Sequence, residues 1–185
     1  ASPELGKLHP VYADKADEET EMFYETFQYS GMSLLYCSDE YAKWANALDI
    51  RDIYDYFLVQ LKYLHWQFNR EGSRPWLLKS PMFMGFEKQL ARIFPQGFKT
   101  IYLHRSPEKI IPSATKVMEA QKALHFDMPP QSEKARDQML AWNTGAVRAH
   151  LRWRDKNPSA EILDLSFNEV TNDSVKTCKK ICDFV

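Results

Sequence analysis

Two side chains near the middle of the sequence have the types and the spacing needed to bind an anion, Arg105 and Ser113. Arg105 follows the apolar run FKTIYLH, which predicts a buried strand, and precedes Ser106-Pro107, a favourable N-cap and first helical residue. A helix N-terminus offers unpaired N–H groups, and an arginine adds a planar, permanently charged fork suited to phosphate oxygens. Ser113 stands eight positions later and could add a hydroxyl, since Pro112 is expected to distort the first turns. A strand-end arginine in an ordinary surface ion pair is the alternative.

Lys79 and Ser80 form a second pair of polar residues at the end of a predicted strand, WLLK (76–79). Ligands of parallel sheets bind outside the carboxyl ends of the strands, so we expect this pair and Arg105 at the same edge. The Lys79 ammonium could stabilise charge that develops on a leaving oxygen, and Ser80 could hydrogen-bond the same group. A lysine that simply reaches solvent is the alternative.

The elements that must position these residues alternate along the second half of the chain. WLLK, FKTIYLH and EILDL predict three short strands, with helices at 82–94, about 107–124 and about 133–156 and a last helix capped by Asn172 or Asp173. Strands that alternate with helices of this length indicate βαβ units and a parallel sheet flanked by helices. Three strands are few for such a sheet, so we expect at least one more before residue 1.

The first half of the chain is predicted to be mostly helical. Residues 1–16 have the composition of a loop, a helix is expected from Asp17, and Ser38 is a good cap for a second, short helix. The strongest helical pattern follows and is closed by Gly72; its apolar residues are Ile50, Ile53, Phe57, Leu61, Leu64 and Phe68.

Composition narrows the classes of protein. The formal net charge of −1 over 185 residues gives no general electrostatic reason to bind nucleic acid. The three cysteines, at 37, 178 and 182, suit neither a disulfide framework nor a metal site, and the last two are expected on a buried helical stripe. We therefore expect a reducing, cytoplasmic setting, and neither a signal peptide nor a membrane span is visible. The chain opens without Met and stops inside a predicted helix, so we expect it to be part of a longer protein.

The segment RPWLLKSPMF, followed after a short gap by ARIFPQGFKTIYLHRSPEKIIPSATKV, resembles the PAPS-dependent sulfotransferases. The branch in question has the pattern W-x-L-K-S-P-x-H, then F-P, then H-R-D-P and P-S. The likeness is specific over 74–113 and supportive over 161–185. It implies an α/β fold of the three-layer, P-loop sulfotransferase type, with a short parallel sheet that lacks its first strand and loop. It also implies one domain over 1–185, with a helical acceptor side at 1–72 and a donor-binding core at 73–185.

The resemblance also implies roles for the residues at the strand ends. Arg105 and Ser113 would bind the 3′-phosphate of 3′-phosphoadenosine 5′-phosphosulfate (PAPS), and Lys79, with Ser80 beside it, would assist departure of the 5′-phosphate. Phe167 would stack on adenine, a core position being the alternative for that ring. A sulfonate would then pass to a hydroxyl or amine of a small-molecule acceptor without the help of a metal. The acceptor's identity and the oligomeric state stay open.

The sequence departs from the family pattern at two places. The Gly/Ser/Thr-rich loop that wraps the 5′-phosphosulfate has no counterpart among six scattered glycines, so it lies upstream of Ala1 or is lost, and we expect this chain alone to be inactive. Phe83 stands where the family has a histidine, and a phenyl ring cannot accept a proton. Substitutes for the base are His9, Glu18 and Glu19, for which a loop residue and a helix start are the structural alternatives.

Two other classes of protein stay open at this point. One is a degenerate or fragmentary member of the family that serves as a non-catalytic binding module. The other is a P-loop small-molecule kinase, which would need a phosphate loop and a magnesium-binding acid that the sequence does not show.

Overall fold

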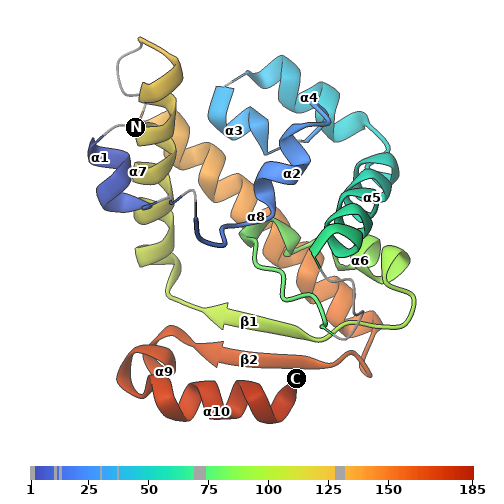
Figure 1. Cartoon of the computed structure of the whole chain (residues 1–185). Helices are drawn as coiled ribbons and strands as arrows, with labels where there is room; N and C mark the ends of the chain where they lie inside the picture. The colour runs from blue at the N-terminus through green and yellow to red at the C-terminus, as the bar shows by residue number, and fades with distance from the viewer. Residues whose placement is uncertain are drawn as a thin grey trace.

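The computed structural model of the chain describes residues 3–10, 12, 14–29, 31–36, 38–68, 74–127 and 132–185. Two parallel strands lie side by side, β1 (Thr100–His104) and β2 (Ile162–Ser166). Their register pairs Thr100 with Ile162 and His104 with Ser166, so both strands end at the same edge. Figure 1 shows helices above the pair and further helices below it. The predicted α/β class with parallel strands is confirmed.

Two long helices make the crossover between the strands, α7 (Pro107–His125) and α8 (Ser132–Lys156). They pack on one another, and Met118 of α7 and Met139 of α8 form a small core cluster with Leu34, which comes from the first half of the chain. Pro107 begins α7, as expected of a residue without an N–H group at the first helical position. Pro112 does not break the helix, which runs unbroken to His125, so the expected distortion does not interrupt it.

The first half of the chain is helical, as predicted, but it contains two short helices that were not expected, Pro3–Leu8 and Met32–Tyr36, and one boundary differs. Its helices are α1 (Pro3–Leu8), α2 (Thr20–Tyr24), α3 (Met32–Tyr36), α4 (Asp39–Ala47) and α5 (Arg51–Phe68). The prediction of a loop over 1–16 is wrong at α1, and α2 begins three residues later than expected. The Ser38 cap is confirmed, since its hydroxyl accepts a hydrogen bond of 3.2 Å from the Tyr41 N–H. Gly72 and residues 128–131 lie outside the described residues.

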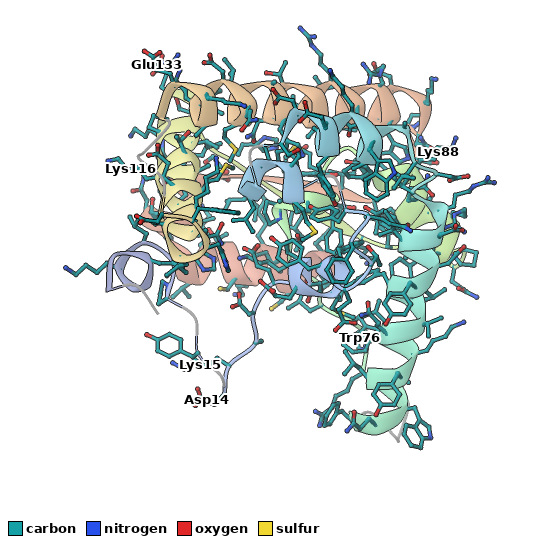
Figure 2. The ribbon with its side chains drawn as sticks, turned by 90° about the horizontal axis from the view of Figure 1, so that it is seen from above. Asp14, Lys15, Trp76, Lys88, Lys116 and Glu133 are labelled. Atoms are coloured by element: carbon teal, nitrogen blue, oxygen red, sulfur yellow. The ribbon has the colours of Figure 1, made fainter. Side chains whose placement is uncertain are left out.

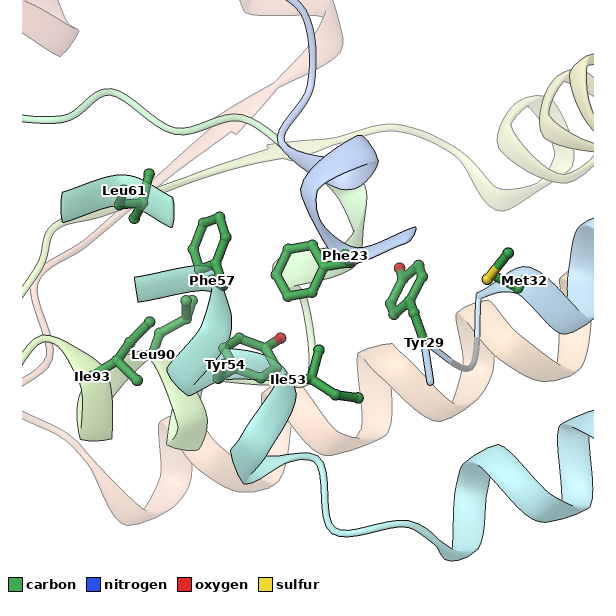
Figure 3. Packing of buried hydrophobic residues seen from close by; sticks show 9 residues of the cluster. All are labelled: Phe23, Tyr29, Met32, Ile53, Tyr54, Phe57, Leu61, Leu90 and Ile93. Carbon is green, nitrogen blue, oxygen red and sulfur yellow. The ribbon is translucent and has the colours of Figure 1, made fainter. Parts of the chain in front are cut away.

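The main core lies where α2, α5 and α6 (Glu87–Ile93) meet, and Figure 3 shows its residues from close by. Phe57 is completely buried and stacks on Phe23, with 4.7 Å between the ring centroids. The predicted apolar series of α5 is buried at Ile53, Phe57 and Leu61, but its last member, Phe68, is 75% exposed. The cluster consists of Phe23, Tyr29, Met32, Ile53, Tyr54, Phe57, Leu61, Leu90 and Ile93.

The predicted strand at 76–79 is wrong, because residues 74–80 pair with neither β1 nor β2. A strand needs a partner for its backbone N–H and C=O groups, and this segment instead packs along α5. Leu78 contacts the main core, and the ring of Trp76 lies 6.4 Å from that of His65. Figure 2 shows Trp76 beside the end of α5. The described part of the sheet therefore has two strands rather than three.

The helix predicted over 82–94 is divided by a turn at Gly85. A short 3₁₀ helix, Pro81–Phe83, comes first and α6 follows. Gly85 adopts a φ of +87°, and a Cβ there would lie 3.0 Å from the backbone of Ala146. Only glycine meets both conditions, so this turn brings the chain close to α8.

Two helices follow β2, α9 (Phe167–Asn172) and α10 (Ser174–Phe184). The cap predicted at 172 or 173 is Asp173, whose carboxylate accepts a hydrogen bond from the Lys176 N–H. The expected buried cysteine stripe is wrong: Cys178 and Cys182 are exposed, and Thr177 is the buried residue of α10. Within the described ranges, no helix is long and apolar enough to cross a membrane.

Candidate functional site

The residues that follow the two strands come together at the carboxyl edge of the sheet. His104 and Ser166 are partners in the ladder, so the next residues along each strand, Arg105 and Phe167, emerge side by side. The guanidinium of Arg105 lies over the Phe167 ring, 4.4 Å from its centroid, which is a cation–π contact. Phe167 is half-buried, and it is therefore a platform for the arginine as well as a packing residue.

Arg105 keeps its hydrogen-bonding edge available. It is exposed, and no carboxylate in the described part of the chain forms an ion pair with it. Stacking uses the flat face of a guanidinium and leaves the in-plane N–H donors for an anion. Ser113 is also exposed, on α7. Because seven residues make about two helical turns, Ser113 lies on the same face of α7 as Ser106, about 10 Å further along the axis.

Lys79 and Ser80 meet an acidic segment from the beginning of α2. The Lys79 ammonium forms an ion pair with the Glu18 carboxylate, and the Lys79 backbone N–H donates to Glu19 Oε2 at 2.6 Å. The residues that follow Glu19 and Lys79 are also in contact, since the hydroxyls of Thr20 and Ser80 lie 2.7 Å apart, within hydrogen-bond distance. The structure thus brings together four of the residues that the sequence singled out, although they lie sixty positions apart in the chain.

The two glutamates of this cluster differ in their environments. Burial raises the pKa of the Glu19 carboxyl, and the hydrogen bond from the Lys79 N–H offsets only part of that rise. The Glu18 carboxylate is held by the Lys79 ammonium instead. A carboxylate whose pKa is raised accepts a proton more readily, so Glu19 has the chemistry of a general base and Glu18 that of a counter-ion.

Two further residues of the expected site lie elsewhere. His9 follows α1, and its backbone N–H donates to the Leu5 carbonyl at 2.7 Å. The helix before it, α1, packs against α7, as Figure 1 shows. None of the described contacts joins His9 to Lys79. Phe83 packs its ring on Phe23 and Phe57, with centroid distances of 6.2 and 6.0 Å. Phe83 is thus a partly buried residue that packs against the main core.

A buried polar network joins β1 to α6 and α8, and the sequence patterns do not indicate it. Glu87, His150 and Tyr102 are 1%, 4% and 7% exposed, and they meet at one carboxylate oxygen. Periodicity gave no signal, because each of the three residues comes from a different element.

Comparison with known proteins agrees with this architecture. The family model described as the sulfotransferase family matches residues 2–185, nearly the whole chain. No curated protein and no solved structure matches the chain. The match covers both strands, the crossover helices, and the clusters at Lys79 and Arg105. The chain therefore belongs to the sulfotransferase family, whose members are transferases that move a sulfonyl group.

Proposed function

We propose that this protein transfers a sulfonate group from PAPS to a hydroxyl or amine of a small-molecule acceptor. The observation that carries the proposal is the geometry of Arg105. Its guanidinium is oriented by Phe167, is free of any described carboxylate, and stands immediately before the N-terminus of α7. Such a site favours a dianionic phosphate, because the arginine and the helix dipole act in the same direction.

In this proposal the 3′-phosphate of the donor lies against Arg105 and the exposed face of α7 that carries Ser113. The ribose-side phosphate is the part of PAPS that most sulfate and nucleotide donors lack, so its recognition would select the donor. Phe167 contacts the guanidinium, and an aromatic ring at this place could also stack on the adenine of the donor.

Lys79 and Glu19 would carry the chemistry. The acceptor oxygen or nitrogen attacks sulfur, its proton passes to the Glu19 carboxylate, and the bond between sulfur and the bridging oxygen of the 5′-phosphate breaks. The electron pair stays on that oxygen, where the Lys79 ammonium stabilises it and Ser80 can donate a hydrogen bond. A donor phosphate at Lys79 must first replace Glu18, the lysine's partner in this structure.

The test is a calorimetric titration of the intact protein with adenosine 3′,5′-bisphosphate and with adenosine 5′-phosphate. Loss of a charge-assisted hydrogen bond is worth about 1.5–3 kcal/mol, so Arg105→Ala should weaken bisphosphate binding about 10- to 100-fold. Binding of the monophosphate should change little, because it lacks the group that Arg105 holds. Arg51→Ala, which removes another exposed arginine, is the matched control. Equal bisphosphate affinity in Arg105→Ala and wild type would refute the donor site.

Turnover separates catalysis from binding alone. A catalytic protein should pass labelled sulfonate from PAPS to some member of a panel of phenols, alcohols and amines. Arg105-dependent binding without transfer to any of them would instead favour the non-catalytic binding module. This second function is considered because Phe83 stands where the family pattern would have a histidine, and a phenyl ring cannot accept a proton.

A further inference from the structure

The buried network between β1, α6 and α8 joins these three elements at one oxygen atom. Glu87 Oε1, from α6, accepts a hydrogen bond of 2.5 Å from the Tyr102 hydroxyl of β1. His150 Nδ1, from α8, lies 2.8 Å from the same oxygen, and the Gly85 N–H donates to it at 3.1 Å. Burial raises the pKa of the Tyr102 hydroxyl and the Glu87 carboxylate adds to the rise, so the hydroxyl remains a donor.

A second carboxylate holds β1 two residues nearer its carboxyl end. Asp164 of β2 lies 2.6 Å from His104 Nε2 and accepts two hydrogen bonds from the Arg154 guanidinium of α8, at 3.0 and 2.8 Å. Arg154 lowers the pKa of the Asp164 carboxyl, with a smaller contribution from His104, so Asp164 is ionised at neutral pH. This bidentate pair has a fixed orientation as well as a favourable energy.

Both networks end on the same helix. His150 and Arg154 are four residues apart on α8 and therefore lie on one face, one turn apart. Each is linked to β1 through one carboxylate, His150 to Tyr102 through Glu87 and Arg154 to His104 through Asp164. Tyr102 and His104 point to one face of the strand because they are two residues apart. In the described part of the sheet β1 is paired along one edge only, by β2. The backbone pairing with β2 is thus one constraint on the carboxyl end of β1, and the side-chain hydrogen bonds that lead to α8 are a second. The strand ends at His104, one residue before Arg105.

We propose that Glu87 and Asp164 are positioning residues for Arg105. Through these carboxylates α8 fixes the carboxyl end of β1, and this sets the point from which the guanidinium reaches Phe167 and the anion. The inference rests on the proposed function, since it concerns the site that binds the 3′-phosphate. Neither carboxylate touches the nucleotide; each acts through the strand.

Two mild substitutions test the proposal in the intact protein. Tyr102→Phe removes only the hydroxyl that donates a hydrogen bond to Glu87. Asp164→Asn removes the negative charge that interacts with His104 and Arg154, at a position that is partly exposed. Because one neutral or charged hydrogen bond is lost, each should weaken binding of adenosine 3′,5′-bisphosphate about three- to tenfold. Tyr41→Phe is the matched control: it removes a tyrosine hydroxyl that donates to the Phe27 and Tyr29 carbonyls, far from β1 in the chain. Its bisphosphate affinity should equal that of the wild type.

A double-mutant cycle distinguishes positioning from loss of stability. If Asp164 acts through Arg105, Asp164→Asn should not change the dissociation constant further in the Arg105→Ala background. If Asp164→Asn acts by general destabilisation, its effect on the dissociation constant should add to that of Arg105→Ala. Unchanged affinity in both single variants, with Arg105→Ala still impaired, would overturn the positioning role and leave the proposed function intact. An additive cycle would also overturn it. No effect of Arg105→Ala would instead reject the proposed function itself. Should Tyr102→Phe fail to fold, Asp164→Asn and its cycle decide the matter.

Discussion

Arg105 lies with its guanidinium 4.4 Å from the centroid of the Phe167 ring, and each of these residues directly follows one of the two parallel strands. The contact is a consequence of strand order and register, since parallel neighbours deliver their carboxyl ends to the same place. It orients a cation at a helix N-terminus, and no carboxylate among the described residues forms an ion pair with that cation. The candidate donor site depends on this relationship.

Phe167 should therefore affect binding through Arg105. Phe167→Leu removes the cation–π contact, worth about 0.5–2 kcal/mol, and should weaken binding of adenosine 3′,5′-bisphosphate about 2- to 30-fold. Phe167→Tyr keeps an aromatic face and should stay near the wild-type affinity. Calorimetry of both variants, and of Phe167→Leu with Arg105→Ala, checks the prediction. A full additional loss in the double variant would mean that the ring acts on the nucleotide directly.

Lys79 should contribute to the chemical step more than to binding. Removing one positioned donor from a developing negative charge typically costs about 10²–10³ in rate, so Lys79→Met should lower kcat by that factor. Lys43→Met, at an exposed lysine of α4, should leave kcat unchanged. Steady-state rates of sulfonate transfer from PAPS measure both. A wild-type kcat in Lys79→Met would exclude the lysine from the chemistry.

Glu19 should make stability depend on pH in a particular direction. Burial raises its pKa above the ordinary 4.5, so the folded protein binds this proton more tightly than the unfolded chain does. The contribution of Glu19 to stability is therefore complete below pH 4.5 and is lost as the pH rises through the folded-state pKa. Glu19→Gln cannot ionise and should gain stability relative to the wild type between about pH 4 and pH 7. Urea unfolding at several pH values measures the difference; a constant difference would contradict the prediction.

Phe57 should be among the most sensitive core positions. It is completely buried between α2 and α5 and stacks on Phe23, so Phe57→Ala should lower the free energy of unfolding by about 3–5 kcal/mol. Val59, two residues along the same helix, is 57% exposed, and Val59→Ala should change it by less than about 1 kcal/mol. Urea unfolding followed by circular dichroism checks both. A small loss for Phe57→Ala would mean that the cluster in Figure 3 contributes little to the fold.

Much of the local structure was contained in short sequence patterns. The helix α5, the Ser38 and Asp173 caps and the strand before Arg105 each depend on residues within a few positions of one another, and these predictions are confirmed. The apolar series of α5 is buried except at its end, where Phe68 is exposed. The alternation of strands and helices likewise predicted parallel strands with a helical crossover. The division into 1–72 and 73–185 stays a prediction, as do the roles of the site residues.

Only the tertiary structure determined which residues from distant parts of the chain contact one another. Residues 76–79 have the composition of a strand, yet a strand forms only where another offers its backbone groups, and this segment packs on α5 instead. The same holds for Lys79 with Glu18, and for Glu87 with Tyr102 and His150. Spacing along a chain reports which residues share a face of one element. Which faces then meet depends on how distant elements pack. The carboxylates that bind Lys79 and the side chains of β1 could therefore be identified only in the folded molecule.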